Sequence, residues 1–513
     1  MTNTEPLPLE LLAEKIWCGD SHLNFTRRFF VPRMGFKFQV NWHHVYICEK
    51  LDAIINGTAK CRNIVFNVPP GAGKTELCGG NLVARGLAIN PRARYLYLSY
   101  SEELVSDVLA TAKNIVSSDE FQALWHIDFA KDTSAKRNWK TMVEGYYAGH
   151  AYGNSLGGQI TGRRAGVLGV DGFSGMIVID DPIKPEDAFS QPLRTKAVRK
   201  LINTVQSRKA HPDVPVVMIM QRLHVDDPTG AVEKNLFVGD WEIIKIPALI
   251  DDDYISTLPD HIQSLIPHNA ERDDKGRQSY WPEKESLAHL LQLEQGGNDK
   301  DGAAVSRYTM SSQYQQEPTK LGGGLIKTEY FGRYKTLPPL KWRAVWADTA
   351  QKTAQHNDFS VFLCAGLGYD NNLYLIDLVR GRWESPQLIA AAKAFFNKHR
   401  PKTNELGTLR RLYVEDKVSG TTLIQTIEQE NDIPVVAIQR GTDKLTRFMD
   451  VQPFIEMRRV YLPEDVEQHP WVPDYLAECE AFTANMTHDF DDQIDPTIDA
   501  INETLVNPYD LFD

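Results

Sequence analysis

Residues 64–75, which read IVFNVPPGAGKT, decide the fold of the N-terminal half of the chain. Residues 64–68 form a short apolar, β-rich run that is typical of a buried strand. A glycine-rich turn follows at 69–75, and an apolar segment of helical character comes after it. In a strand, turn and helix of this order, backbone N–H groups converge on phosphate oxygens at the start of the helix. The stretch therefore predicts a nucleotide-binding loop in an α/β domain.

Five consecutive residues of this loop are expected to hold ATP: Gly71, Ala72, Gly73, Lys74 and Thr75. The lysine would reach the β- and γ-phosphates, and the threonine hydroxyl would bind Mg²⁺. The usual pattern opens with a glycine where this chain has Val68, so the match is partial. A chance GKT tripeptide on an ordinary turn is the alternative, and the flanking strand and helix argue against it.

A second acidic motif is the expected partner of this loop. Residues 176–179 are a short buried-strand pattern that ends in Asp180-Asp181. We expect Asp180 to hold the Mg²⁺ shell and Asp181 to act catalytically, by orienting or deprotonating the attacking water. Many such ATPases have glutamate in the second place, and an acidic pair is otherwise often a simple turn at a strand end. Together with 95–100 and 214–220, these runs predict a parallel sheet covered by helices.

A second set of strand patterns begins in the C-terminal part of the chain, at 343–346, 360–365, 373–378 and 411–414. Between the two sets, the sequence QEPTKLGGG at 316–324 is rich in turn-forming residues. The 513 residues are too many for one ordinary core and enough for two or three. We predict an α/β domain at 1–318, a linker at 319–324 and a second α/β domain at 325–513.

The second domain carries acidic residues at three separated places. Asp348 follows one strand pattern, Glu415 ends another, and Asp491 and Asp492 lie near the C-terminus. Carboxylates that converge from such positions hold the two Mg²⁺ or Mn²⁺ ions of a phosphodiesterase, and their hard oxygens disfavour zinc. The C-terminal acids would otherwise cap a solvated helix. Asp358, Asp416 and Asp495 are expected helpers, and Asp416 would be the one to exchange roles with Glu415.

Overall charge does not argue against a nucleic-acid partner. The net charge is −12, but residues 464–513 contain fourteen acidic residues and no Lys or Arg. The near-neutral remainder is compatible with a basic groove. No apolar run is long enough to span a bilayer, and the N-terminal residues lack the pattern of a secretory signal, so we expect a cytoplasmic protein without a membrane partner.

In their combined order, several motifs resemble the large terminase subunits of tailed bacteriophages. They are FQVNWHH (38–44), NVPPGAGKT (67–75), YLYLSYS (95–101), ITGRRAG (160–166), MIVIDDPIK (176–184), VVMIMQRLHVDDPTG (216–230) and SSQYQQEP (311–318). The resemblance covers nearly the whole chain. It implies a RecA/ASCE-like P-loop ATPase followed by an RNase H-like nuclease, with Asp348, Glu415 and one or both of Asp491 and Asp492 at the nuclease site.

The resemblance also implies roles that no single residue would suggest. Gln39 matches the glutamine that reads adenine, which a carboxamide does through two hydrogen bonds. Arg163 and Arg164 match the arginine supplied to a neighbouring subunit's ATP, although an extra glycine-rich stretch before Asp180 loosens the alignment. Gln221 and Arg222 occupy the place where terminases couple hydrolysis to movement. A surface or salt-bridge role remains the alternative for each.

The resemblance implies ATP-driven translocation of double-stranded viral DNA into a procapsid and metal-dependent cutting of concatemeric DNA. The implied partners are double-stranded DNA, the portal protein of the procapsid, the small terminase subunit and further copies of this chain in a ring. The implied location is the host cytoplasm and, transiently, the portal vertex. The alternatives are a DNA-repair helicase–nuclease and a non-enzymatic nucleotide-binding assembly protein. Neither a second RecA-like core nor further helicase motifs follow residue 230, and the retained Lys74, Thr75, Asp180 and Asp181 argue for an enzyme.

Overall fold

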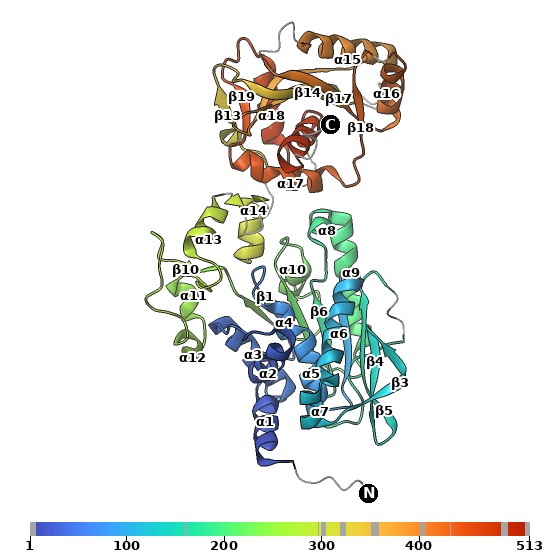
Figure 1. The fold of residues 1–513 in the computed structure, drawn as a ribbon, viewed down its shortest axis with the longest axis vertical. Coiled ribbons are helices and arrows are strands. Elements are labelled where there is room, and N and C mark those ends of the chain that lie inside the picture. Colours follow the sequence, from blue (N-terminus) through green and yellow to red (C-terminus); the bar gives the residue numbers. More distant parts are fainter. Residues whose placement is uncertain are drawn as a thin grey trace. The chain divides into compact units, whose positions relative to one another are not determined.

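The computed structural model describes residues 7–158, 160, 162–295, 297–298, 304–318, 325–349, 359–400, 406–430, 432–483 and 491–507. The chain divides into two compact units (Figure 1). Unit 1 contains Met1–Leu291 and Tyr308–Thr319, and unit 2 contains Gln292–Arg307 and Lys320–Asp513. The predicted linker at 319–324 lies outside the described residues.

The sheet of unit 1 has the strand order β3-β4-β5-β2-β6-β7-β1-β8. Its strands are β1 (Asn63–Asn67), β2 (Arg94–Ser99), β3 (Asp128–Ala135), β4 (Asn138–Val143), β5 (Tyr146–Ser155), β6 (Ile177–Asp180), β7 (Val216–Met220) and β8 (Trp241–Lys245). From β5 to β8 each neighbouring pair is parallel, whereas β3, β4 and β5 pair antiparallel. The four predicted strands of this half are confirmed as β1, β2, β6 and β7.

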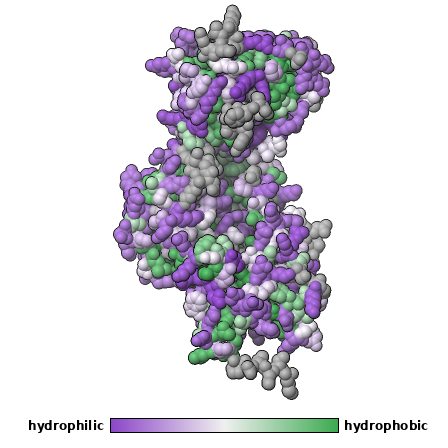
Figure 2. Space-filling model, viewed as in Figure 1, coloured by the Kyte–Doolittle hydropathy of each residue, from purple (hydrophilic) through white to green (hydrophobic). Residues whose placement is uncertain are grey.

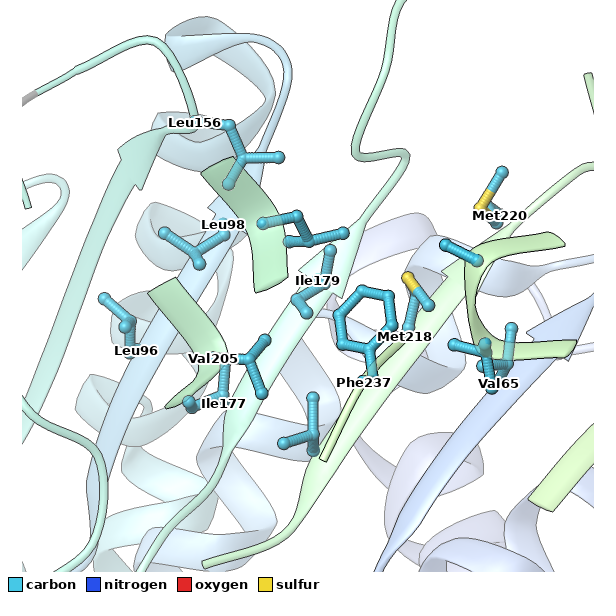
Figure 3. Close-up of a cluster of buried hydrophobic side chains, with 14 of the residues drawn as sticks. Val65, Leu96, Leu98, Leu156, Ile177, Ile179, Val205, Met218, Met220 and Phe237 are labelled. Atoms are coloured by element: carbon cyan, nitrogen blue, oxygen red, sulfur yellow. The ribbon is translucent and has the colours of Figure 1, made fainter. Parts of the chain in front are cut away.

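Helices cover both faces of this sheet. Leu96 and Leu98 of β2 join one buried cluster with Val65, Met218 and Val205, the last of which comes from α9 (Gln191–Arg208) (Figure 3). Successive strand residues point to opposite faces, so the other face of β2 carries tyrosines. There the Tyr95 hydroxyl donates to the carbonyl of Leu82 in α5 (Gly80–Ile89) at 3.2 Å.

The remaining elements of unit 1 surround this sheet. They are α1 (Leu9–Asp20), α2 (His22–Met34), α3 (Trp42–Ile55), α4 (Lys74–Cys78), α6 (Glu102–Ser117), α7 (Asp119–Trp125), α8 (Pro185–Phe189), α10 (Pro228–Glu233), α11 (Asp252–Ser256), α12 (Asp260–Gln263), β9 (Leu249–Ile250) and β10 (Gln278–Ser279). Helix α13 (Leu287–Glu294), helix α14 (Arg307–Thr309) and the π-helix Met310–Tyr314 lie where the chain passes between the units.

Unit 2 is built on a seven-stranded mixed sheet of order β13-β19-β16-β15-β14-β17-β18. Its strands are β13 (Gly332–Tyr334), β14 (Leu340–Asp348), β15 (Ser360–Gly368), β16 (Leu373–Gly381), β17 (Thr408–Glu415), β18 (Val435–Ile438) and β19 (Val460–Pro463). Unit 2 also contains a separate two-stranded antiparallel sheet of β11 (Gly297–Asn298) and β12 (Ala304–Val305). The central strands β14, β15 and β16 run antiparallel, while β17 pairs parallel with β14.

Two helices seal one face of the second sheet, α15 (Ser385–His399) and α16 (Val418–Glu430). Phe395 of α15 and Ile427 of α16 are buried in one cluster with Val345 and Phe362 of the sheet. Helix α19 (Ile494–Ile501) packs against β14 and β15 and also against α17 (Lys444–Glu456). Helix α18 (Trp471–Ala481), the 3-10 helix Thr328–Tyr330 and the π-helix Asn502–Val506 complete the described part of this unit.

The described part of the chain contains no helix that is both long and apolar enough to cross a lipid bilayer. The face shown in Figure 2 is mostly hydrophilic, with hydrophobic residues in small, separate patches. The α/β class predicted from the sequence is confirmed, with parallel strands at the centre of the first sheet and a mixed second sheet.

The buried cluster of unit 1 gives a direct test of this packing. Leu98→Ala should lower the free energy of unfolding by about 2–5 kcal/mol, because Leu98 is fully buried and its truncation leaves a cavity. Leu236→Ala is the matched control, since Leu236 is 53% exposed and its truncation should cost less than about 0.5 kcal/mol. Urea unfolding of both variants measures the difference. Equal effects would contradict the assigned core.

Candidate functional sites at two sheet edges

The glycine-rich loop connects β1 to α4 at the carboxyl edge of the first sheet. Gly71 and Gly73 both adopt left-handed backbone angles, with φ of 70° and 77°. A side chain at either position would be strained, and a Cβ on Gly73 would also lie 3.0 Å from His44 Nε2. Lys74 begins α4, and Thr75 is exposed next to it. The predicted loop residues therefore lie together in a tight turn that only glycine permits.

The acidic pair lies beside this loop. One strand, β7, separates β6 from β1, and all three run in the same direction, so their carboxyl ends meet at one edge. Lys74 Nζ forms an ion pair with Asp181 Oδ2. Asp181 itself has a φ of 42°, an uncommon angle for a residue other than glycine. This strained backbone turns its carboxylate back toward the loop lysine.

Asp180 ends β6 and is almost fully buried. The Tyr97 hydroxyl donates to its Oδ2 at 2.9 Å, while its Oδ1 has no hydrogen-bond partner. Burial, and then the neighbouring Asp181, raise the pKa of Asp180 above its usual range. A buried carboxylate oxygen without a partner, close to the loop, fits a Mg²⁺ ion bound with ATP.

Gln39 is exposed, and its neighbours place it close to the loop. The Phe38 ring lies 4.9 Å from the ring of His44, and a Cβ on Gly73 would be 3.8 Å from Phe38 Cζ. Two residues further, Asn41 N–H donates to His44 Nδ1 at 3.0 Å. The predicted adenine-binding residue thus belongs to a segment that packs against the loop.

The arginines of the predicted finger differ in their surroundings. The Arg163 guanidinium lies 5.0 Å from the centre of the Tyr152 ring, whereas Arg164 is exposed. Arg222, proposed for coupling, is buried and bonds Asp227 at 3.0 Å and Glu233 at 3.2 Å. Arg222 therefore forms ion pairs within unit 1, and the roles predicted for Arg163, Arg164 and Arg222 stay predictions.

The second site lies at the end of two adjacent parallel strands of unit 2. Asp348 ends β14 and Glu415 ends β17, and the register pairs Ala347 with Val414. Arg440 joins the two acids, since its Nη1 lies 3.0 Å from Asp348 Oδ1 and 2.8 Å from Glu415 Oε2. The two predicted acids therefore lie side by side around one guanidinium group.

Helix α19 brings two more carboxylates to the same guanidinium. Arg440 lies 3.5 Å from Asp495 and 2.7 Å from Asp499. The two aspartates are four residues apart and therefore lie on one face of the helix. Of the predicted helpers, Asp495 joins the cluster directly. Asp499 was not predicted from the sequence.

Asp491 and Asp492 lie at the margin of this cluster. Lys444 Nζ is 2.9 Å from Asp491 and 2.8 Å from Asp495, so Asp491 is joined to the cluster through a lysine. Asp492 accepts a hydrogen bond from the backbone N–H of Phe359 at 3.3 Å, and burial raises the pKa of its carboxyl to about 6. Their roles as metal ligands stay predictions.

The other two helper acids differ from Asp495. Asp416 is exposed and accepts hydrogen bonds from Thr421 at 2.8 Å and Gln439 at 2.7 Å. Glu415, rather than Asp416, therefore contacts the cluster. Asp358 lies outside the described residues.

The cluster is a set of buried acids neutralised by the chain's own cations. Burial, and then the charge of Asp495, raise the pKa of Asp348, while Lys444, Arg440 and Arg447 lower the pKa of Asp495 against the effect of burial. Among the described residues, no three Asp, Glu, His or Cys side chains are arranged to hold a metal ion. The oxygen donors suit a hard divalent cation, and the space between them is held by Arg440.

The match to a protein family falls on this unit. Residues 345–504 match the family described as the terminase RNaseH-like domain. This match confirms the RNase H-like class predicted for the second domain and its resemblance to terminases. The motifs quoted between residues 38 and 318 lie outside the matched segment. No curated protein matches the chain.

Solved structures of large terminases are also similar to this chain. One is the large terminase of a thermophilic bacteriophage in complex with ADP, with 11% identity, a TM-score of 0.45 and coverage of 89% of this chain and 99% of that chain. The HK97 bacteriophage large terminase has 12% identity, a TM-score of 0.35 and coverage of 94% and 99%. The large terminase nuclease of thermophilic phage G20c with bound zinc has 15% identity, a TM-score of 0.25 and coverage of 35% and 94%.

Arg440→Ala tests the charge balance of the cluster. Removing the guanidinium leaves buried carboxylates without compensation, which should lower the free energy of unfolding by about 3 kcal/mol or more. Mn²⁺ should restore part of the loss, because a divalent cation bound to the native acids supplies positive charge. Urea unfolding with and without Mn²⁺ measures both effects.

Arg400→Ala is the matched control for that experiment. Arg400 is 46% exposed and lies 3.6 Å from Asp432, so its loss should cost less than about 1 kcal/mol. An Arg440→Ala variant as stable as Arg400→Ala would contradict the proposed charge balance.

Proposed function

We propose that this chain is the large subunit of a phage terminase, which couples ATP hydrolysis to translocation of double-stranded DNA into a procapsid and cuts concatemeric DNA. The observation that carries the proposal is the pairing of two chemically distinct sites on one chain. A phosphate loop with its lysine on an acid of the neighbouring motif serves the first activity. A carboxylate cluster, in a segment matching the terminase nuclease family, serves the second.

We assign the two activities to the two predicted domains. Residues 1–318 would form the ATPase, residues 319–324 the linker, and residues 325–513 the nuclease. The segment Gln292–Arg307 clusters with the second unit and would contribute to the nuclease side. Separate domains with separate sites should allow either activity to be removed without the other.

The ATP site would use the loop, the acidic pair and the segment around Gln39. The residues proposed to bind ATP and Mg²⁺ are Gln39, Gly71, Ala72, Gly73, Lys74, Thr75 and Asp180. Bound Mg²⁺ would neutralise phosphate charge during transfer. Backbone N–H groups of the loop would hold the phosphates, and the carboxamide of Gln39 would distinguish adenine from guanine.

Lys74 and Asp181 would exchange partners during the reaction. In their ion pair, each neutralises the other. When the lysine moves to the phosphates of ATP, the Asp181 carboxylate becomes available to orient the attacking water and accept its proton. Arg163 or Arg164 of a neighbouring copy would then neutralise charge on the transferred group. Of the two, Arg164 is the more exposed in this structure.

The nuclease would cut the DNA backbone at the acidic cluster. Asp348 and Glu415, with Asp491 and Asp492, are the proposed ligands, and the position of Asp495 beside Asp348 adds it to this set. Two bound Mg²⁺ or Mn²⁺ ions would polarise the scissile phosphate and lower the pKa of the attacking water. The chain's own acids would orient that water, and Arg440 would have to leave the position between them.

The proposed partners follow from this activity. Double-stranded DNA is the substrate of both domains, and the portal protein, the small terminase subunit and further copies of this chain in a ring would form the packaging machine. The machine would assemble in the host cytoplasm and act at the portal vertex. No membrane is needed for either reaction.

Lys74→Ala should abolish DNA-stimulated ATP hydrolysis, because the phosphates lose the charge that the loop supplies. Plasmid cleavage by the same variant, in Mn²⁺ without ATP, should stay close to that of the native protein, since the second site lies in another unit. Phosphate release and plasmid nicking measure the two activities on one preparation. Near-native ATP hydrolysis in this variant would contradict the assignment of this loop as the phosphate-binding site.

Asp348→Ala should have the opposite effect, with metal-dependent cleavage lost and ATP hydrolysis near normal. Glu415→Gln should behave in the same way, because both acids contact the same guanidinium group. Asp416→Asn is the matched control, since Asp416 is exposed and accepts hydrogen bonds from Thr421 and Gln439. If Asp416→Asn stops cleavage while Glu415→Gln cuts normally, the two acids have been assigned the wrong way round.

A further inference from the structure

Lys284 lies outside every motif considered above, yet its ammonium group rests on the phosphate loop. Its Nζ donates to the carbonyl of Gly71 at 2.7 Å and to that of Pro70 at 3.4 Å. A Cβ built on Gly71 would lie 2.1 Å from this nitrogen, so the ammonium directly covers the glycine. The lysine is 213 residues from Gly71 in the sequence and contacts the loop that is proposed to bind ATP.

The segment that carries Lys284 is fixed to the start of α3. The Tyr280 carbonyl accepts hydrogen bonds from Asn41 Nδ2 and Trp42 Nε1, both at 2.8 Å. The Lys284 N–H in turn donates to the carbonyl of Trp281 at 3.1 Å. These bonds hold the backbone of 280–284 in place beside the loop. The long lysine side chain, whose surface is 29% exposed, is the part that can change its conformation.

Two neutral histidines also contact the phosphate loop. His43 and His44 both place Nε2 at 3.2 Å from the carbonyl of Ala72, and the ring of Trp281 packs on both. Burial lowers the pKa of His43 well below its usual range and that of His44 to about 4, so both are neutral at pH 7. Of these three side chains at the loop, only Lys284 therefore carries a positive charge.

The carbonyl and carboxylate acceptors of Lys284 carry less negative charge than the phosphates of a nucleotide. Its hydrogen bonds to Gly71 and Pro70 end on neutral carbonyls, and it forms an ion pair with the single carboxylate of Glu285 at 3.6 Å. The bonds from the ammonium to these carbonyls are already charge-assisted, and an ionised phosphate adds a full negative charge on the acceptor side. An anion bound in the loop would therefore draw the ammonium from the carbonyl of Gly71.

We propose that Lys284 is a second phosphate-binding lysine, which leaves the carbonyl of Gly71 to pair with the terminal phosphate of bound ATP. This inference rests on the proposed ATPase function and deepens it. Lys74 begins the helix after the loop, and Lys284 reaches the loop from the side of α3. Because Lys284 is carried by a segment bonded to Asn41 and Trp42, the terminal phosphate would be linked to the segment that holds Gln39.

The test compares nucleotides that differ in their terminal phosphate. Isothermal titration of the full chain with ATPγS and with ADP, each with Mg²⁺, gives two dissociation constants per variant. Lys284→Ala should weaken ATPγS binding by about tenfold, and ADP binding much less, because one charge-assisted hydrogen bond to the terminal phosphate is lost. Lys284→Arg should restore most of the preference for ATPγS, since arginine also carries a positive charge.

The controls separate phosphate binding from a structural effect. Lys60→Ala is the matched control, because Lys60 is exposed and precedes β1 at the edge opposite the loop. Thermal melting shows whether each variant is folded, and Lys284→Gln replaces Lys284→Ala if the alanine variant unfolds. Equal losses for ATPγS and ADP would overturn the proposal, because they would indicate a loosened loop. Unchanged binding of both nucleotides would overturn it as well.

The two levels of the proposal fail in different ways. If the native chain binds neither nucleotide, the ATPase function falls and the role of Lys284 falls with it. If the native chain binds both nucleotides and Lys284→Ala binds them equally well, only the role of Lys284 is wrong. The titration of the native chain therefore comes first.

Discussion

Neighbouring parallel strands end at the same edge of a sheet, and both proposed sites depend on this constraint. In unit 1 it places the loop after β1 beside the acids after β6, with β7 between them. In unit 2 it places Asp348 beside Glu415 at the ends of β14 and β17. Because strand interiors are buried and apolar, polar side chains gather where the strands stop. One geometric rule thus positions both proposed sites.

Charge compensation within the chain is the second theme that the sites share. Lys74 pairs with Asp181, and Arg440 contacts Asp348, Glu415, Asp495 and Asp499. Buried or half-buried acids are costly without a counter-charge, so each site supplies its own cation. A nucleotide or metal ion must then replace a bond that already exists. This competition gives each site a defined resting arrangement.

Strands with a continuous apolar pattern could be predicted from the sequence. Strands and contacts without such a local pattern could not. The strands around the loop and around Asp348 are short, apolar and continuous, so they were visible from periodicity. The strands β3 to β5 on one side of the first sheet were not, because polar and small residues such as those of DFAKDTSA and YYAGHAYGNS interrupt the pattern. The antiparallel side of the first sheet therefore came from the structure.

The site residues divide in the same way. Asp348 and Glu415 are the last residues of their strands, Asp181 directly follows one, and Lys74 follows the loop after β1. Strand patterns therefore pointed to all four residues. Arg440 and Lys284 carry no motif, since lone cations are common on any surface. A signal for Asp499 existed in its spacing of four residues from Asp495 on one helix. Asp491 and Asp492 were predicted from their place at an expected helix start and from the resemblance to terminases.

Co-crystallisation of the full chain with ATPγS and Mn²⁺, followed by anomalous diffraction at the manganese edge, tests both proposed metal sites in one experiment. We predict manganese beside Thr75 and Asp180, and manganese between Asp348 and Glu415 with the Arg440 guanidinium displaced. Both sites would then be metal centres on one chain. The contrary result is ATPγS in the loop, no manganese at the second cluster and Arg440 still between its acids. That result would contradict the proposed metal-dependent nuclease site.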